Sequence, residues 1–305
     1  MRGVVGRVRV SVPASVANLG PGFDTLGLAL DLFNVVEVET GGGDVRVDMV
    51  GEARHLPLAD NLVLRAIRHA FAAAGSALPP LSLRLTNRIP AGCGMGSSAA
   101  AIVAGVVVAN SLLGEPWPPE GLLALATELE GHPDNVAPAL WGGLVVSCLS
   151  PEGVRWVRLE APSELQAVLV IPEIEVPTRE ARRVLPETVP FRDAVFNVGR
   201  VALLVAALSG RRYDLLREAM RDRLHQPYRA PLVPGLEDGL RAAERAGALG
   251  AALSGAGPGL LAFAVGDYRP IVEAVQAALA RHGLSSAWMV ARPTDWGALA
   301  TVRCR

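Results

Sequence analysis

The chain contains no lysine, so all 29 of its basic residues are arginine. This absence excludes the Walker A phosphate loop, which requires a lysine after its last glycine. The arginines nearly balance the 30 acidic residues and leave a net charge of −1, without the positive surplus that nucleic acids or anionic membranes attract. We therefore expect no nucleic-acid partner and no membrane partner.

Cysteines and long apolar runs are also scarce. Cys93, Cys148 and Cys304 form no C-x-x-C pair and no disulfide pattern, which suits a reducing compartment. The N-terminus lacks the apolar core of a signal peptide. Apolar runs such as residues 99–109 are shorter than the roughly 18 residues that a membrane span requires. We therefore expect a cytoplasmic protein.

Strands dominate the first 50 residues. Val8, Val10 and Val12 alternate as in a half-buried strand, and a run of glycines between residues 34–40 and residues 45–50 predicts a β-hairpin. Residues 81–89 also alternate, which is typical of an antiparallel strand with one wet face.

Helical spacing predicts six helices farther along the chain. They cover residues 61–74, 97–113, 119–130, 194–208, 235–247 and 270–282. Strands and helices are mixed without strict β–α–β alternation, which favours the α+β class. Pro151, Gly153 and Pro162 cluster where two domains would meet. We expect one domain over residues 1–155 and a second over residues 156–305.

Residues 90–105, "PAGCGMGSSAAAIVAG", place three glycines and two serines directly before an expected helix. Glycines let backbone amides approach an anion, and a helix N-terminus adds unpaired N–H groups and partial positive charge. The hydroxyls of Ser97 and Ser98 add donors or a ligand for Mg²⁺. The stretch therefore predicts a phosphate site that needs no lysine, although a tight turn for close helix packing would also use small residues.

The same stretch matches the dinucleotide fingerprint through Gly94, Gly96 and Ala99. The strand before it is half-exposed, and the acidic residue expected about 20 positions later would be Glu115, inside a proline-rich loop. This context argues against a dehydrogenase.

The loop "PAGCGMGSSAA" is similar to the phosphate loop of the GHMP kinases, with Met95 in place of the commoner leucine. Two other stretches lie where that family has its remaining motifs, at residues 12–30 and 253–263. Within the family, the homoserine kinases resemble this chain most specifically, through "NLGPGFD", "EGHPDNVAPALWGG", "TREARRVLP" and "HQPYR". Six motifs in the right order span nearly the whole chain.

The resemblance implies the GHMP kinase fold, with an N-terminal ribosomal-S5-domain-2-like domain that binds ATP and a C-terminal ferredoxin-like domain that completes the substrate site. It implies that MgATP and L-homoserine are converted to ADP and O-phospho-L-homoserine, in threonine biosynthesis, by an enzyme that is commonly a homodimer. The implied nucleotide-binding residues are Pro90, Ala91, Gly92, Cys93, Gly94, Met95, Gly96, Ser97, Ser98, Ala99 and Ala100.

Homoserine is a zwitterion, so its site must pair with a carboxylate and an ammonium. The resemblance implies that Arg182 and Arg229 bind the carboxylate, which suits planar guanidinium groups. It also implies that Asp24 takes the ammonium and that Asn18 and His132 face the substrate. Without these motifs, we would interpret the two arginines as solvated surface residues. Asn18 and Asp24 would be interpreted as ordinary turn residues.

The resemblance implies a Mg²⁺ site of Ser98 with a glutamate, either Glu130 or Glu128, and we prefer Glu130. Asn135 stands where some relatives have a catalytic aspartate, and an asparagine cannot accept a proton as a base. Because phosphoryl transfer passes through a loose transition state, positioning and charge neutralisation can suffice. We therefore expect Asn135 to orient the hydroxyl, whose proton leaves late to the phosphate, and Asp134 to be structural.

Two further alternatives remain. A GHMP kinase for another small alcohol would act on a substrate such as mevalonate, which has no ammonium for Asp24. A non-catalytic ligand-binding member would have lost its phosphate and magnesium residues, whereas the loop, Ser98 and a glutamate are all present.

Overall fold

Two long strands, β1 (Val5–Asn18) and β2 (Gly22–Thr40), organise the first sheet as an antiparallel pair. The computed structural model describes residues 5–41, 46–51 and 61–304. The strand order is β11-β1-β2-β4-β3, and the β5–β6 pair is attached to the first half of β2. The added strands are β3 (Arg46–Gly51), β4 (Leu81–Asn87), β5 (Leu144–Ser150), β6 (Gly153–Leu159) and β11 (Leu299–Cys304).

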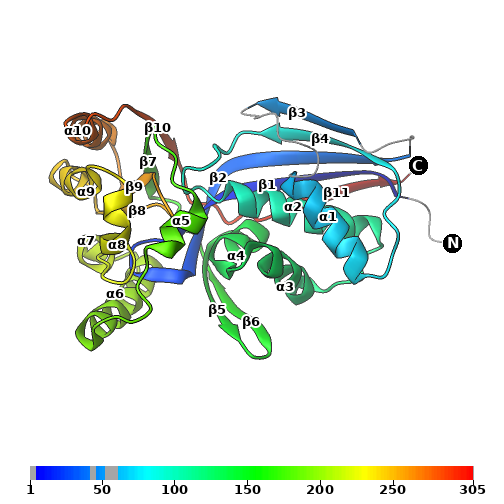
Figure 1. Cartoon of the computed structure of the whole chain (residues 1–305), viewed down its shortest axis with the longest axis horizontal. Helices are drawn as coiled ribbons and strands as arrows, with labels where there is room; N and C mark the ends of the chain where they lie inside the picture. Colours follow the sequence, from blue (N-terminus) through cyan, green and yellow to red (C-terminus); the bar gives the residue numbers. More distant parts are fainter. Residues whose placement is uncertain (1–4, 42–45, 52–60, 305) are drawn as a thin grey trace.

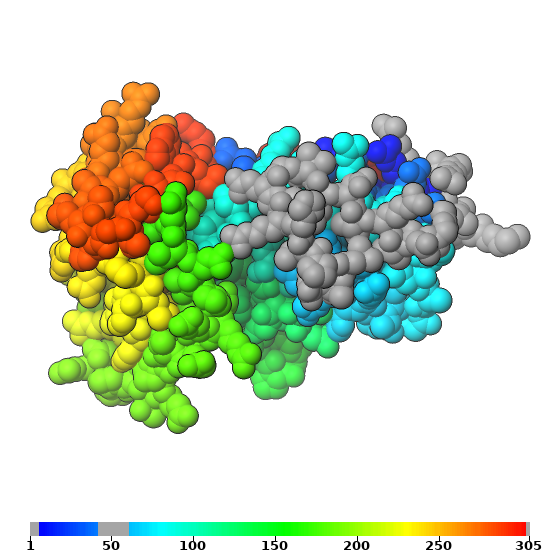
Figure 2. All heavy atoms as spheres, turned by 45° about the horizontal axis from the view of Figure 1, so that its top comes forward, coloured from blue at the N-terminus to red at the C-terminus, as the bar shows by residue number. Residues whose placement is uncertain are grey.

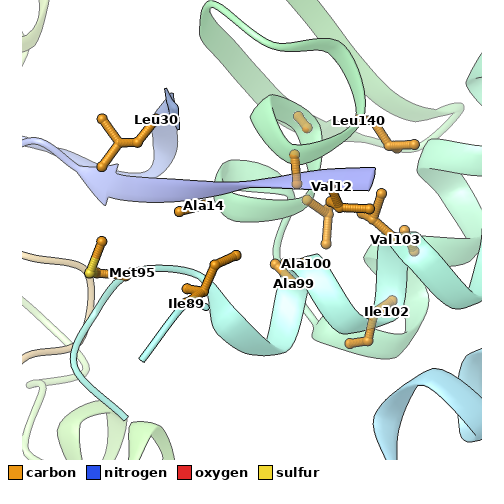
Figure 3. Packing of buried hydrophobic residues seen from close by; sticks show 14 of the residues in the cluster. Val12, Ala14, Leu30, Ile89, Met95, Ala99, Ala100, Ile102, Val103 and Leu140 are labelled. Atoms are coloured by element: carbon orange, nitrogen blue, oxygen red, sulfur yellow. The ribbon is translucent and has the colours of Figure 1, made fainter. Parts of the chain in front are cut away.

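Four helices cover this sheet: α1 (Leu62–Ala73), α2 (Ser97–Leu112), α3 (Pro119–Glu130) and α4 (Pro133–Trp141). Helix α2 is apolar on nearly every face because α1, α3, α4 and β1 surround it (Figure 1). Figure 3 shows Val12 and Ala14 of β1 beside Ala99, Ala100 and Val103 of α2. Their small side chains let α2 lie close to the sheet. This close packing fixes the position of the α2 N-terminus.

The second sheet is antiparallel, with the order β10-β7-β9-β8. Its strands are β7 (Gln166–Pro172), β8 (Gly250–Leu253), β9 (Leu260–Ala264) and β10 (Ser286–Ala291). Helices α9 (Leu236–Arg245) and α10 (Arg269–Ala280) pack their apolar sides on it. Numbered along the chain, these four strands lie in the order fourth, first, third, second, which is the ferredoxin-like arrangement.

The remaining helices lie in the long connection between β7 and β8 of the second sheet. They are α5 (Thr178–Arg183), α6 (Phe191–Ser209), α7 (Leu216–Ala219) and α8 (Gln226–Arg229), with 3₁₀ turns η2 (Tyr213–Leu215) and η3 (Ala230–Leu232). No helix among the residues described is long and apolar enough to cross a membrane. The expected α+β class is confirmed.

The predicted hairpin between residues 34–40 and 45–50 is wrong. Strand β3 does not pair with β2; it lies at the edge of the sheet and pairs in parallel with β4, from Arg46 beside Ser82 to Gly51 beside Asn87. Strand β4 inserts between them and pairs with β2. The run of glycines predicted that the chain turns back after β2. The strand that then pairs with β2 is β4, whose alternating apolar residues suit a position inside the sheet.

We propose a domain boundary that follows β6, since this strand continues through residue 155 as the partner of β5. The chain then forms the second sheet and its helices, and β11 returns to pair with β1. Figure 2 shows α9 and α10, in yellow and orange, gathered at one end of the molecule, with the cyan residues of α1 toward the other. In this division the last strand belongs to the N-terminal domain.

Candidate active site

A cavity of about 430 Å³ lies between the two parts of the fold. Its walls come from the β1–β2 turn, the start of α1, the end of β4, the loop before α2, the junction of α3 and α4, α5, α8 and the loop between β8 and β9. The cavity brings together all six expected substrate residues: Asn18, Asp24, His132, Asn135, Arg182 and Arg229. These six residues come from four parts of the chain: the β1–β2 turn, the α3–α4 junction, α5 and α8.

The glycine loop before α2 forms one wall. Gly92, Gly94 and Gly96 have φ angles of 71°, 80° and 64°, a region that favours glycine. Ser254 Oγ donates a hydrogen bond of 2.8 Å to the carbonyl of Gly94, and a Cβ on Gly94 would lie 2.0 Å from the Ser254 carbonyl oxygen. The β8–β9 loop therefore fixes the conformation of the glycine loop.

The expected nucleotide residues divide into two groups. Ala91, Gly92, Gly94, Met95, Gly96, Ser97 and Ser98 line the cavity. Pro90, Cys93, Ala99 and Ala100 are not among its lining residues, and Cys93, Ala99 and Ala100 are buried against the core. Cys93 is held by its Sγ, which donates to the carbonyl of Pro90.

Ser98 and Glu130 face each other across the cavity, where Ser98 Oγ donates a hydrogen bond of 2.7 Å to Glu130 Oε1. Burial raises the pKa of the Glu130 carboxyl above its ordinary value, although the Ser98 hydroxyl and the nearby His132 and Arg182 act in the opposite direction. Glu128 lies outside the cavity and contacts His69 Nε2 at 3.1 Å. A hydroxyl and a carboxylate are ligands that suit Mg²⁺.

Asp24 and Arg182 form a bidentate ion pair: Arg182 Nη1 donates to Oδ2 at 3.0 Å and Nη2 to Oδ1 at 2.7 Å. Both side chains are about one-third exposed, so the pair is open to the cavity. Asn18 shapes this corner, since its Oδ1 accepts from the Asp24 amide at 3.1 Å and its Nδ2 donates to the Gly255 carbonyl at 3.0 Å.

Arg229 is buried, with 2% of its surface exposed, beneath the aromatic ring of Phe23. Its Nε donates to the Ala181 carbonyl and its Nη1 to the Gly255 carbonyl, at 3.0 and 3.1 Å. Burial lowers the pKa of this guanidinium to about 10, helped by the neighbouring Arg182 charge. At neutral pH Arg229 therefore remains a cation.

His225 supports Arg229 from behind. Its Nε2 lies 2.7 Å from the Gly20 carbonyl, which can only accept, so Nε2 carries the proton and Nδ1 accepts from Arg229 Nη1 at 3.3 Å. The ring is stacked on Phe23 with 5.2 Å between centroids. Burial, together with the Arg229 charge, lowers the pKa of His225 despite the nearby Asp222 carboxylate. The histidine is therefore neutral here.

Asp134 and Asn135 lie in the first turn of α4, and His132 directly precedes this helix. His132 Nδ1 donates to Asp134 Oδ1 at 2.5 Å. Burial alone would lower the pKa of His132, but this hydrogen bond and the charge of Asp134 raise it overall. Asn135 Oδ1 accepts a hydrogen bond of 2.9 Å from Ser15 Oγ.

Three contributors were not singled out from the sequence: Ser15, Phe23 and His225. Phe23 and His225 belong to the motifs "GPGF" and "HQPYR", but only the folded structure stacks them around Arg229. Strand alternation places Ser15 on the face of β1 opposite to Val12 and Ala14, where a polar residue is expected to be exposed. In the structure Ser15 is fully buried, so the alternation did not indicate its role.

Two family models match the chain: "GHMP kinases N terminal domain" over residues 61–143 and "GHMP kinases C terminal" over residues 203–285. The chain belongs to the GHMP kinase family. It is therefore an ATP-dependent kinase, and the expected GHMP kinase fold is confirmed.

Within that family the chain is similar to proteins named homoserine kinase. It is 46% identical to the homoserine kinase of Moorella thermoacetica over 95% of this chain and 98% of that protein. It is 43% identical to that of Carboxydothermus hydrogenoformans over 96% of each. Similarity at this level extends along essentially the full length of both chains.

Solved structures give the same picture. The homoserine kinase from Cytophaga hutchinsonii superposes with a TM-score of 0.86 at 33% identity, covering 99% of each chain. The L. major mevalonate kinase in complex with R-mevalonate has a TM-score of 0.73 at 17% identity, covering 96% of this chain and 98% of that one, so this likeness concerns the fold alone.

Proposed function

We propose that the protein is a homoserine kinase, which transfers the γ-phosphoryl group of MgATP to the hydroxyl of L-homoserine and yields ADP and O-phospho-L-homoserine for threonine biosynthesis. One observation carries the proposal. A single cavity holds a glycine-rich loop at a helix N-terminus and, opposite it, one carboxylate beside two guanidinium groups. The first arrangement suits phosphates, and the second complements an amino acid zwitterion.

In this proposal Asp24 binds the substrate ammonium, and Arg182 and Arg229 bind its carboxylate. Arg229 is held rigidly by main-chain carbonyls, whereas Arg182 is half-buried and bound mainly by Asp24. The zwitterion would take over both partners of that ion pair, so neither charge is left unpaired. Asn18 and His132 complete the site around the substrate.

The amides and hydroxyls of the glycine loop bind the phosphates, and Ser98 with Glu130 holds Mg²⁺. The donor set fits the ion, because both side chains offer oxygen and Glu130 is the acidic group that faces Ser98. When bound, Mg²⁺ would neutralise phosphate charge that develops during transfer. Glu128 is bound to His69 outside the cavity, which supports Glu130 as the ligand.

Asn135 orients the acceptor hydroxyl without removing its proton. Its amide lies in the first turn of α4, at the edge of the cavity that also contains Ser98 and Glu130. A loose phosphoryl-transfer transition state needs little activation of the nucleophile, so alignment and charge neutralisation supply most of the rate.

We also propose a cytoplasmic homodimer. Phe191, Val195 and Val198 lie on one side of α6 and are 84%, 54% and 67% exposed. A contiguous apolar face of this kind commonly marks a protein interface. Light scattering on the purified protein would give twice the chain mass, and Val198→Glu would reduce it; a monomer at micromolar concentration would contradict the dimer.

The test of the proposed function is ADP release from MgATP with L-homoserine, mevalonate, L-serine or no acceptor. We expect rapid release with L-homoserine alone. Turnover with mevalonate instead would overturn the assignment of Asp24 and the arginines while leaving the kinase class intact. ATP binding without turnover on any acceptor would favour a non-catalytic member of the family.

A further inference from the structure

Ser15 is fully buried in β1, outside the cavity, yet it contacts a residue inside it. Its Oγ lies 2.9 Å from Asn135 Oδ1 and 3.3 Å from the Asn135 carbonyl oxygen. Gly96 covers the contact, since a Cβ on this residue would lie 2.2 Å from Ser15 Oγ and 2.9 Å from Asn135 Oδ1. The hydroxyl is thus enclosed between α4 and the last glycine of the phosphate loop.

The neighbours of Asn135 decide which way its amide faces. The Asp134 carboxylate, 3.5 Å from the other end of the amide, can only accept hydrogen bonds, so the Nδ2 end must face it. An amide oxygen in that place would oppose the carboxylate, and Asp134 Oδ1 already accepts from His132. The oxygen end therefore faces Ser15, whose hydroxyl is the donor.

We propose that Ser15 is a positioning residue that locks the Asn135 amide with its nitrogen available to the acceptor hydroxyl. The inference rests on the proposed function and adds a residue and a direction to it. Because Oδ1 is turned toward Ser15, the amide presents Nδ2 to the substrate: one N–H faces Asp134 and the other donates to the hydroxyl oxygen of homoserine. That hydrogen bond engages one lone pair of the hydroxyl oxygen, leaves the second lone pair to attack the γ-phosphorus, and turns the proton away from Asn135.

This orientation keeps the hydroxyl proton away from Asn135 and is consistent with its late transfer to the phosphoryl group. The homoserine oxygen forms a bond to the γ-phosphorus, the bond from that phosphorus to the β–γ bridging oxygen breaks, and its electron pair stays on ADP. The hydroxyl proton passes to a non-bridging oxygen of the transferred phosphoryl group and is released to solvent. No protein base is required, which agrees with a loose transition state.

The experiment is a double-mutant cycle on kcat with L-homoserine and saturating MgATP. We expect Ser15→Ala to lower kcat about tenfold, the factor that corresponds to the loss of one oriented hydrogen bond. Asn135→Ala should lower kcat about 100-fold, because it removes the N–H donor itself. Because Ser15 acts through Asn135, the double variant should match Asn135→Ala within about twofold.

Ser147→Ala is the matched control. Ser147 is also buried and donates one hydrogen bond, to the Thr25 carbonyl, but does not line the cavity. We expect its kcat to stay within about twofold of the wild type even if its Tm falls. Should Ser15→Ala fail to fold, Ser15→Cys keeps the volume with only a weak S–H donor and enters the same cycle.

Several outcomes would overturn the inference: an unchanged kcat in the Ser15 variant, multiplicative losses in the double variant, or a loss confined to the KM for ATP. These results are distinguishable from failure of the proposed function, because that failure would appear in the wild-type enzyme as an absence of homoserine phosphorylation.

Discussion

Arg182 and Asp24 are 158 residues apart in the sequence, yet two hydrogen bonds of 2.7 and 3.0 Å join them at the edge of the cavity. They are the two groups expected to bind opposite charges of the substrate. A ligand that carries both an ammonium and a carboxylate can replace each partner of the pair. A ligand that carries only one of these charges leaves the other protein group desolvated and unpaired.

This relationship predicts strict selection of zwitterions. We expect 4-hydroxybutyrate, which lacks the ammonium, and homoserinol, which lacks the carboxylate, to have kcat/KM values at least about 100-fold below that of L-homoserine. Asp24→Asn should lower kcat/KM for L-homoserine to a similar extent and leave the KM for ATP unchanged. Comparable kcat/KM values for all three acceptors would contradict the prediction.

The two arginines should differ in their contribution to stability. Arg229→Met leaves the buried Ala181 and Gly255 carbonyls without their charged donor, and we expect a loss of about 2–4 kcal/mol in the free energy of unfolding. Arg182→Met breaks a partly exposed pair, whose loss should cost about 1 kcal/mol or less. Urea unfolding of both variants measures the difference, and equal losses would argue against it.

The partly buried Glu130 carboxylate should lower the free energy of unfolding of the metal-free protein, although it is the expected ligand of Mg²⁺. Its raised pKa means that the folded protein holds this proton more tightly than the unfolded chain does, so stability falls as the pH rises through the folded pKa. Without Mg²⁺ at pH 7.5, Glu130→Gln should therefore be at least as stable as the wild type, with an advantage that vanishes below about pH 4.5.

The same variant should lose at least about 100-fold in kcat and its response to Mg²⁺. Glu128→Gln is the control, since this carboxylate lies on the same helix but contacts His69 outside the cavity. We expect its kcat to stay within about twofold of the wild type. A large loss in Glu128→Gln, with an active Glu130→Gln, would reassign the metal ligand.

Protonation of His225 at acid pH should destabilise the folded protein around Arg229. Because its pKa is lowered in the folded protein, the stability contributed by neutral His225 is complete above pH 6.5, its ordinary pKa, and is lost as the pH falls toward the folded pKa. Protonation would place a second donor against Arg229 Nη1. The free energy of unfolding of the wild type, relative to His225→Gln, should therefore fall between pH 7 and pH 5, and a constant difference would refute this.

Local patterns in the sequence predicted much of the fold. The glycine loop, the apolar helix after it and the helix ending at Glu130 follow from residue type and spacing within short windows, and all three are present. The pairing of β3 failed because edge position and register depend on β4, which arrives 30 residues later. Strand neighbours are set by competition across the whole sheet, which a local hairpin signal does not report.

The site shows the same limit. Motifs identified Asp24, Arg182, Arg229 and Asn135 as members of one cavity, but the ion pair of Asp24 with Arg182 joins segments that no periodicity connects. Ser15 was missed because strand alternation assigns only two faces, and both faces of β1 are covered near the phosphate loop. Burial on the second face is a property of the assembled fold.

The most direct measurement is identification of the product formed by the purified enzyme from MgATP and L-homoserine, by ³¹P NMR and mass spectrometry. Our account predicts a phosphomonoester of homoserine in equal amount to ADP, and none when L-homoserine is omitted. Release of ADP with inorganic phosphate alone, or phosphorylation of mevalonate but not of L-homoserine, would contradict it.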